Sequence, residues 1–387
     1  MTSKYSQNFK NLFNFSRIFA RLCGCDVINV NYKMHWKTLA IFILMNMALG
    51  SLFYSNYVEV IVKGDVYNLL KTTSVVGTGV QGYAKFINVI KQKNNFRFVY
   101  NEILDMYETC ELKSHAYTKW LAYNLALIKK LLLITFLIAL MTSVGVIIVP
   151  IYMLIFMNKR VDVLPFAWPF IDGSTDIGFY ITLVGHISCV IFGGYGNFAN
   201  DSWLFIFASH VTLMKNVLKC KFDDLDEILK EFPKDPKKSK EPLDDIFKWH
   251  QKYLIFCNTI RDTFFWVIFI QIGFEFLGII CTIVCMFLDI WPPAPVYLIY
   301  LYSLLISYCS LGNLVELSND DVIEMIYNSC WYNLTVSEQK MILIMLRESQ
   351  KSKGISIGGV APLSMNTALQ ITKTVYTMTM MLMESLN

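Results

Sequence analysis

The chain has 387 residues, of which 55% are hydrophobic and only 17% are charged, and its mean hydropathy is +0.44. Soluble domains are about a quarter charged, so this composition excludes disorder, collagen-like repeats and most soluble globular folds. The formal net charge of +4 is too small to indicate binding to nucleic acid. We therefore expect an all-α membrane protein that has lipid as its solvent.

The first 36 residues are polar and basic, and five of them are Lys or Arg. A cleaved signal peptide needs an apolar stretch at this place, so none is expected and the first span must itself direct insertion. Insertion by that route leads by default to the plasma membrane. Residues 1–36 are predicted to form a cytosolic segment.

Seven apolar stretches are candidates to cross the bilayer, whose hydrocarbon core of about 30 Å needs roughly 20 helical residues. Five of them are strong, and two that contain lysines are weaker. The strong stretches are 39–61, 131–157, 177–213, 263–288 and 296–314, and the weaker ones are 66–90 and 363–383.

The distribution of charge decides whether the weaker stretches cross, because cytosolic loops retain Lys and Arg. If all seven stretches span, the segments 1–36, 91–130, 215–252 and 317–354 on one side of the membrane hold 26 Lys and Arg, and the segments on the other side hold 3. This alternation would be lost if residues 66–90 did not cross. We therefore predict seven transmembrane helices with a cytosolic amino terminus and an extracellular carboxyl terminus, which is the reverse of a G-protein-coupled receptor.

Some of the predicted helices are too long for the bilayer. Apolar and amphipathic residues continue from 177 through 217, and residues 318–354 keep a helical rhythm of apolar side chains with charges between them. Such helices usually bury their apolar stripes against one another. We predict that residues 318–354 are a cytosolic anchor helix, that 232–242 is a short charged loop, and that the glycine-rich 354–362 is a break.

Two carboxylates lie inside predicted spans, where a charge in lipid is costly. Asp201 and Glu275 therefore need partners, and the candidates are Arg261, Lys71 or water. The run Gly-Tyr-Gly at 194–196 copies the end of a potassium-channel filter but lies in the middle of a span. We interpret it as helix packing or a local kink.

The chain contains ten cysteines, and five of them lie inside apolar stretches. Their spacing lacks the companion Cys or His residues of a zinc site, and no nucleophile is matched with a base. We expect no cofactor, no bound metal and no enzymatic activity.

The carboxyl-terminal third carries the most specific motifs. Residues 317–334 include Leu-Ser-Asn-Asp-Asp-Val and Ile-Tyr-Asn-Ser-Cys-Trp-Tyr-Asn-Leu, and residues 358–377 include Gly-Gly-Val-Ala-Pro-Leu-Ser-Met-Asn-Thr and Lys-Thr-Val-Tyr-Thr. Residues 164–172 read Leu-Pro-Phe-Ala-Trp-Pro-Phe-Ile-Asp. Together with the length and the inverted seven-helix topology, these motifs resemble those of insect odorant receptors.

The resemblance implies a ligand-gated, nonselective cation channel in the plasma membrane of olfactory sensory neuron dendrites. Its expected partners are a small volatile organic odorant, membrane lipid and the shared odorant receptor co-receptor (Orco), with which it would form a heterotetramer. The co-receptor has a much longer loop between its fourth and fifth spans than residues 232–242 provide. The chain therefore resembles an odorant-tuning subunit.

A gustatory-receptor-type cation channel that acts as a homomer is the alternative. That sister family ends in Thr-Tyr, five apolar residues and Gln-Phe. The matching positions here begin with Thr377-Met378 and end with Glu384-Ser385. Because these residues differ from the gustatory-receptor ending, they favour the odorant receptor family.

The last span of the family lines a central pore, which implies that residues 355–387 hold a pore-lining seventh helix. A cation pore needs polar groups and apolar constrictions. The motif match places Met381 and Ser385 at the gate and Glu384 at a pore-facing position; methionines that merely face lipid are the alternative. The predicted pore and gate residues are Thr377, Met378, Met381, Glu384 and Ser385.

The family binds odorants on the extracellular side, in a pocket among the second, third, fourth and sixth spans. Residues 37–317 are accordingly predicted to hold helices one to six and this pocket, lined mostly by hydrophobic and aromatic side chains. His186 is either a hydrogen-bond partner for the odorant or a structural histidine. The predicted pocket residues are Val76, Val80, Tyr83, Ser143, Val146, Pro150, Tyr180, Leu183, His186, Ile187, Val190, Tyr297, Tyr300 and Leu304.

Overall fold

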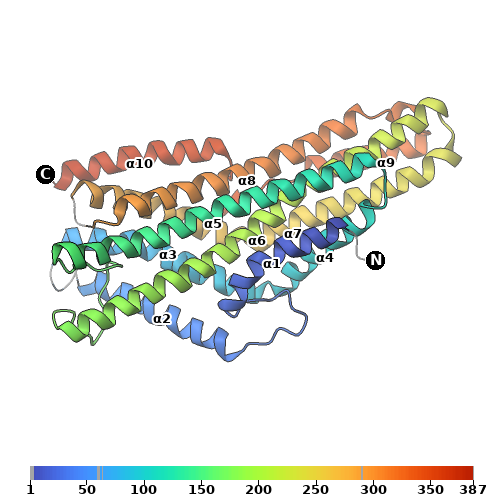
Figure 1. Ribbon diagram of the computed structural model, residues 1–387. Coiled ribbons are helices and arrows are strands. Elements are labelled where there is room, and N and C mark those ends of the chain that lie inside the picture. The colour runs from blue at the N-terminus through green and yellow to red at the C-terminus, as the bar shows by residue number, and fades with distance from the viewer. Residues whose placement is uncertain (1–3, 59–61, 63, 289–290, 387) are drawn as a thin grey trace.

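The structure, a computed structural model, describes residues 4–58, 62, 64–288 and 291–386. This part of the chain forms an elongated bundle of helices with one small hairpin of two strands (Figure 1). The predicted all-α fold is confirmed. In chain order the elements are α1 (Lys4–Leu22), α2 (Trp36–Tyr57), α3 (Val66–Lys91), α4 (Lys93–Cys110), α5 (His115–Met157), α6 (Asp176–Glu231), α7 (Pro236–Phe287), α8 (Ala294–Asn328), the 3-10 turn η2 (Trp331–Asn333), α9 (Val336–Gln350), β1 (Ser356–Ile357), β2 (Ala361–Pro362) and α10 (Met365–Leu386).

Each predicted span corresponds to one helix, namely α2, α3, α5, α6, α7, α8 or α10. Within the described residues, α2, α5, α6, α7 and α8 are long and apolar enough to cross a membrane. α3 and α10 correspond to the two weaker stretches, which contain lysines. The end of the first predicted span, 59–61, lies outside the described residues.

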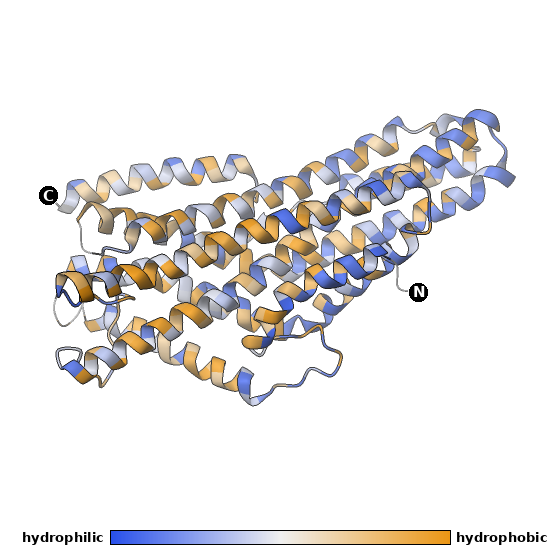
Figure 2. Cartoon of the chain, viewed as in Figure 1, coloured by the Kyte–Doolittle hydropathy of each residue, from blue (hydrophilic) through white to orange (hydrophobic). Residues whose placement is uncertain are grey.

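Three helices are far longer than a bilayer requires. α5, α6 and α7 contain 43, 56 and 52 residues, and at 1.5 Å per residue α6 extends roughly 84 Å. A hydrocarbon core is only about 30 Å thick. Figure 2 shows hydrophilic residues gathered at the end of the bundle that holds α4 and α9. This end therefore projects beyond the apolar part of the bundle.

The amino-terminal segment, predicted only to be polar and cytosolic, forms the amphipathic helix α1. Its Phe9 and Phe13 are fully buried. The Phe9 ring stacks 5.2 Å from the ring of Tyr107 in α4, and the Phe13 ring lies 6.0 Å from Trp203 in α6. Stacked and tilted aromatic pairs add to the stability that buried area provides. Aromatic side chains of α1 and α4 thus build a buried core with α6.

Residues 318–354 do not form the single helix that the sequence predicts. α8 continues to Asn328, η2 follows, and α9 starts only at Val336. A capping box explains the restart, because the side chains of Thr335 and Glu338 each accept a hydrogen bond from the other residue's backbone amide. The segment therefore bends, and α9 packs back against α8.

The predicted charged loop 232–242 is also mostly helical. α7 begins at Pro236, directly after Asp235, whose carboxylate accepts a hydrogen bond from the Lys237 amide at 2.9 Å. Proline fits the first turn of a helix because its missing N–H has no intrahelical partner there. Only residues 232–235 connect α6 to α7.

The predicted glycine-rich break folds as the hairpin β1–β2, which leads into α10. Gly358 and Gly359 occupy its turn with φ of 59° and 77°, a conformation that side chains rarely adopt. α10 then packs on α7 and α8. Just before α10 begins, Leu363 lies very close to Gly312 of α8. A Cβ added to Gly312 would overlap the carbonyl oxygen of Leu363 and lie 2.7 Å from the Cβ of Leu363.

We expect Gly312→Ala to destabilise the bundle by about 1–3 kcal/mol, because the added methyl group must displace the backbone before α10. Gly273→Ala in α7 is the matched control, since nothing lies within 4 Å of the Cβ it would add. The control should keep or gain up to about 1 kcal/mol from helix propensity. Thermal unfolding of the purified variants in detergent measures both effects. Equal midpoints would contradict the close approach.

Candidate functional site

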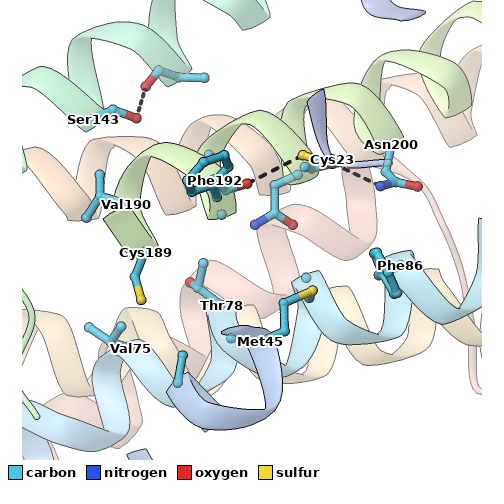
Figure 3. A pocket seen from close by; sticks show the side chains of 18 of the residues that line it. Cys23, Met45, Val75, Thr78, Phe86, Ser143, Cys189, Val190, Phe192 and Asn200 are labelled. Carbon is cyan, nitrogen blue, oxygen red and sulfur yellow. Dashed lines mark hydrogen bonds between the residues drawn. The ribbon is translucent and has the colours of Figure 1, made fainter. Parts of the chain in front are cut away.

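A cavity of about 200 Å³ lies inside the bundle between α2, α3, α5, α6 and α8. Met45 of α2, Val75 and Phe86 of α3 and Ser143 of α5 line it from different sides (Figure 3). An apolar protein cavity of about 150 Å³ already holds benzene. The cavity therefore has room for a somewhat larger small molecule.

The wall of this cavity is electrically neutral. Among the described residues that line it, none carries an Asp, Glu, Lys, Arg or His side chain. Cys23 and Cys25, which follow α1, contribute thiols to the wall. Burial raises the pKa of both thiols, that of Cys23 to about 12, so they stay protonated at physiological pH.

The connection between α5 and α6 covers one side of the cavity. Leu164 and Phe166 of this connection line the cavity, and Phe166 and Trp168 are buried. The Ala167 amide donates a 2.9 Å hydrogen bond to Ser55 Oγ of α2. The loop motif recognised in the sequence is therefore a fixed cover, held by buried aromatic rings and by a polar contact with α2.

His186, the predicted polar pocket residue, supports this cover. Its side chain is fully buried, and its ring lies 4.5 Å from the ring of Phe166. Its Nδ1 accepts a hydrogen bond from the Leu164 amide at 3.4 Å. His186 lies behind Phe166 and does not line the cavity. This geometry favours the structural interpretation of His186.

The other predicted pocket residues divide into two groups. Five residues line the cavity, and they come from α5, α6 and α8: Ser143, Val146, Val190, Tyr297 and Tyr300. Eight do not line it: Val76, Val80, Tyr83, Pro150, Tyr180, Leu183, Ile187 and Leu304.

The physical reason for the division is the depth of the cavity along α6. The first turns of this helix lie beyond the cavity, and Tyr180 is 58% exposed. α6 reaches the cavity only at Cys189 and continues along it to Trp203. Val76 and Val80 belong instead to the apolar cluster beneath the cover.

Sequence reasoning missed the contributions of α2 and of the deeper part of α6. α2 supplies Ile41, Leu44, Met45, Ala48, Leu49 and Leu52. Asn197, Asn200 and Trp203 come from α6. The polar Asn197 in an apolar stretch was a signal that could have been used.

Glycines of α6 create part of the open space. A Cβ added to Gly193 would meet nothing within 4 Å, whereas one on Gly194 would lie 3.2 Å from Ser143 Oγ and one on Gly196 3.6 Å from Cys23 Sγ. α6 runs through this run of residues as a regular helix. The interpretation as helix packing therefore fits Gly194 and Gly196, while Gly193 borders the cavity.

A buried ion pair lies just beyond the cavity. Lys85 Nζ of α3 is 2.6 Å from Asp201 Oδ1 of α6, with side chains only 2% and 6% exposed. Tyr308 of α8 donates a 2.5 Å hydrogen bond to the same carboxylate oxygen. Asp201 therefore pairs with Lys85 and Tyr308 and not with Arg261, which pairs with its neighbour Asp262.

Glu275 of α7 has a different environment. Its Oε1 accepts a 3.5 Å hydrogen bond from Gln271 Nε2, and its Oε2 has no hydrogen-bond partner among the described residues. Lys71, the other predicted partner, makes no ion pair with it there. The hydrogen bond of Glu275 thus stays within its own helix.

α10 packs only one of its faces on the bundle. Val375 and Thr379 are buried against it. The five predicted pore and gate residues lie on the exposed part of the helix: Thr377, Met378, Met381, Glu384 and Ser385.

Comparison with protein families gives a match over most of the chain. The family model described as "7tm Odorant receptor" matches residues 65–376. A Drosophila melanogaster protein that carries the name odorant receptor 83c is 24% identical over 399 residues, which cover 98% of both chains.

Comparison with solved structures shows the same fold. The insect olfactory receptor OR5 from Machilis hrabei in complex with eugenol superposes with a TM-score of 0.79 and covers 96% of this chain and 99% of its own. A second structure of OR5 from Machilis hrabei superposes with a TM-score of 0.73 and covers 96% of this chain and 98% of its own. Both are 11% identical to the chain, so they bear on the fold alone.

We expect Lys85→Met to destabilise the protein by about 3–5 kcal/mol, because it leaves the Asp201 carboxylate buried without its cation. The double variant Lys85→Met/Asp201→Leu removes both charges and should recover much of the loss. Thermal unfolding in detergent measures the wild type, Lys85→Met, Asp201→Leu and the double variant. A double variant as unstable as the sum of its single variants would contradict charge pairing as the cause.

The exposed pair Arg160–Asp176 between α5 and α6 provides the matched control. Solvent screens such pairs, so Asp176→Asn should change stability by less than about 1 kcal/mol.

Proposed function

The chain belongs to the insect odorant receptor family, and from this premise we propose that it is an odorant-gated subunit of a nonselective cation channel. The family is one of multi-pass membrane receptors and not of enzymes. The observation that carries the proposal is the neutral cavity of about 200 Å³ in the interior of the bundle.

The cavity fits a small volatile molecule. Most of its lining is aliphatic or aromatic, and the cover formed by Phe166 and Trp168 shields one side. Burial of an apolar ligand there would gain about 25 cal/mol for each Å² removed from water. We propose the lining residues Ser143, Val146, Val190, Tyr297 and Tyr300 as odorant contacts, together with the α2 side chains.

The proposed topology places the amino terminus in the cytosol and the carboxyl terminus outside. The strong bias of Lys and Arg toward one side supports it, as does the hydrophilic end of the bundle in Figure 2. The proposed location is the plasma membrane of an olfactory sensory neuron dendrite. Residues 1–36 and 318–354 are then cytosolic, and residues 37–317 hold the six helices around the cavity.

We propose that residues 355–387 line the pore and that the subunit assembles with the co-receptor in a heterotetramer. The exposed face of α10, with Thr377 and Glu384, supports a lining role. Only four residues join α6 to α7, and this short connection supports a tuning subunit, because the co-receptor has a much longer loop there. Large exposed side chains in the anchor region are available for subunit contacts: Tyr327, Tyr332, Val336, Leu343 and Ile344. The match to the odorant receptor family model disfavours the gustatory-type alternative.

Cells that express this chain with the co-receptor should give odorant-evoked cation currents when G-protein signalling is blocked. Val146→Trp should raise the half-maximal odorant concentration about tenfold or more, because the indole would occupy the cavity. Val144→Trp is the control, since Val144 is exposed on the same helix. Silence toward a broad odorant panel, with the chain present at the surface, would contradict the proposal.

Glu384→Lys should lower the permeability of Ca²⁺ relative to Na⁺, because a carboxylate near a pore mouth attracts cations. Asp172→Lys in the loop before α6 places the same charge change on an exposed residue away from α10. Reversal potentials in mixed-cation solutions measure both variants. An equal shift in the two would show that α10 does not border the pore at Glu384.

A further inference from the structure

One amide in the cavity wall has no hydrogen bond. Asn197 of α6 is only 6% exposed and lines the cavity. Its Oδ1 has no partner, and its Nδ2 donates to no acceptor, within the part of the chain that the structure describes. Because both atoms are free, exchanging the assigned oxygen and nitrogen of the amide would change nothing in this statement.

The other hydroxyl and amide groups of α3, α5 and α6 in the wall are already bonded. Ser143 Oγ donates to the Ala139 carbonyl at 2.8 Å, and Asn200 Nδ2 donates to the Gly196 carbonyl at 2.9 Å. Thr78 of α3 pairs with the Tyr297 hydroxyl of α8. Asn197 therefore differs from these side chains in making no hydrogen bond; the indole N–H of Trp291, which also lines the cavity, is a second unpaired group among the described residues.

A buried amide without partners is a cost that the native state must carry. A leucine at this position would make the same apolar contacts without this cost. An amide offers hydrogen-bond donors on its nitrogen and an acceptor on its oxygen. A molecule that both accepts and donates would therefore regain what burial of Asn197 loses.

The charge of the wall limits what this molecule is. No Asp, Glu, Lys, Arg or His side chain lines the cavity among the described residues, and Asp201, one turn beyond Asn197, is already paired with Lys85. An ionised carboxylate or amine would be desolvated without a counter-charge. The ligand is therefore neutral and largely apolar, with one group that both donates and accepts.

A hydroxyl group meets this requirement in a single atom. It can donate to Asn197 Oδ1 and accept from Nδ2, whereas an ether or ketone oxygen accepts only and leaves Oδ1 unpaired. Tyr300 lines the same cavity, and its hydroxyl makes no hydrogen bond within the described residues. We propose that Asn197 binds the hydroxyl of a neutral alcohol or phenol; this assignment rests on the proposed odorant-gated function.

The test compares matched ligands on cells that express the chain with the co-receptor. Each carbon skeleton, of about six to nine carbons to suit the cavity, is applied as the alcohol, its methyl ether and the parent hydrocarbon. In the wild type the alcohol should be about tenfold or more potent than its ether, the effect of one unpaired buried atom. Equal potencies of alcohol and ether would overturn the proposal without any variant.

Asn197→Leu then removes the amide at similar volume. The alcohol-to-ether ratio should fall to near one, while the hydrocarbon keeps or gains potency, which a misfolded variant would not show. Asn46→Leu in α2 is the matched control, because Asn46 is exposed and does not line the cavity, and there the ratio should stay as in the wild type. A ratio that persists in Asn197→Leu would also overturn the proposal.

The ligand series separates two kinds of failure. Currents evoked by ethers and hydrocarbons as readily as by alcohols would refute the role of Asn197 and leave the channel function intact. No current from any skeleton, with the chain at the cell surface beside the co-receptor, would count against the proposed function itself and so against the role that rests on it.

Discussion

The buried contact between Lys85 and Asp201 is the constraint on which the interior of the bundle depends. A lysine and a carboxylate removed from water are each costly, so α3 and α6 are stable only at the spacing that pairs them. Tyr308 binds the same carboxylate and fixes α8 to this pair. Asn197 lies one turn from Asp201, so the ion pair also determines where the deep wall of the cavity lies.

α8 connects this interior to the segment before α10. Its first turns present Tyr297 and Tyr300 to the cavity, and Gly312 meets Leu363 farther along the same unbroken helix. The distance along the axis from Tyr300 to Gly312 is about 18 Å. Because Gly312 leaves no free space at this crossing, a shift of α8 on ligand binding has to move the backbone that leads into α10. On the proposed function, α8 is the mechanical link between odorant and pore.

The sequence predicted the helices well and the cavity only in part, for a physical reason. Hydropathy and charge report whether a whole helix is suited to lipid, and each of the seven predicted stretches corresponds to a helix, five of them long and apolar enough to cross a membrane among the described residues. The lining of a cavity depends on the rotation and depth of each helix. Tyr180 and Leu183 were therefore placed too far out along α6, and Lys85 was missed as the partner of Asp201. The break between α8 and α9 was also not predicted, because the start of α9 depends on one local contact, the capping box between Thr335 and Glu338.

Aromatic side chains and glycines have opposite effects in this bundle. Phe9, Phe13 and Trp203 fill a close-packed core, whereas the missing side chain of Gly193 leaves space beside the cavity. Protein interiors are packed as densely as organic crystals, so a cavity arises only where side chains are absent. Space made in this way selects ligands by size but not by chemistry. Because Asn197 adds a hydrogen-bonding group and Gly193 leaves open space at a different position of α6, size and chemical selectivity can change separately in this cavity.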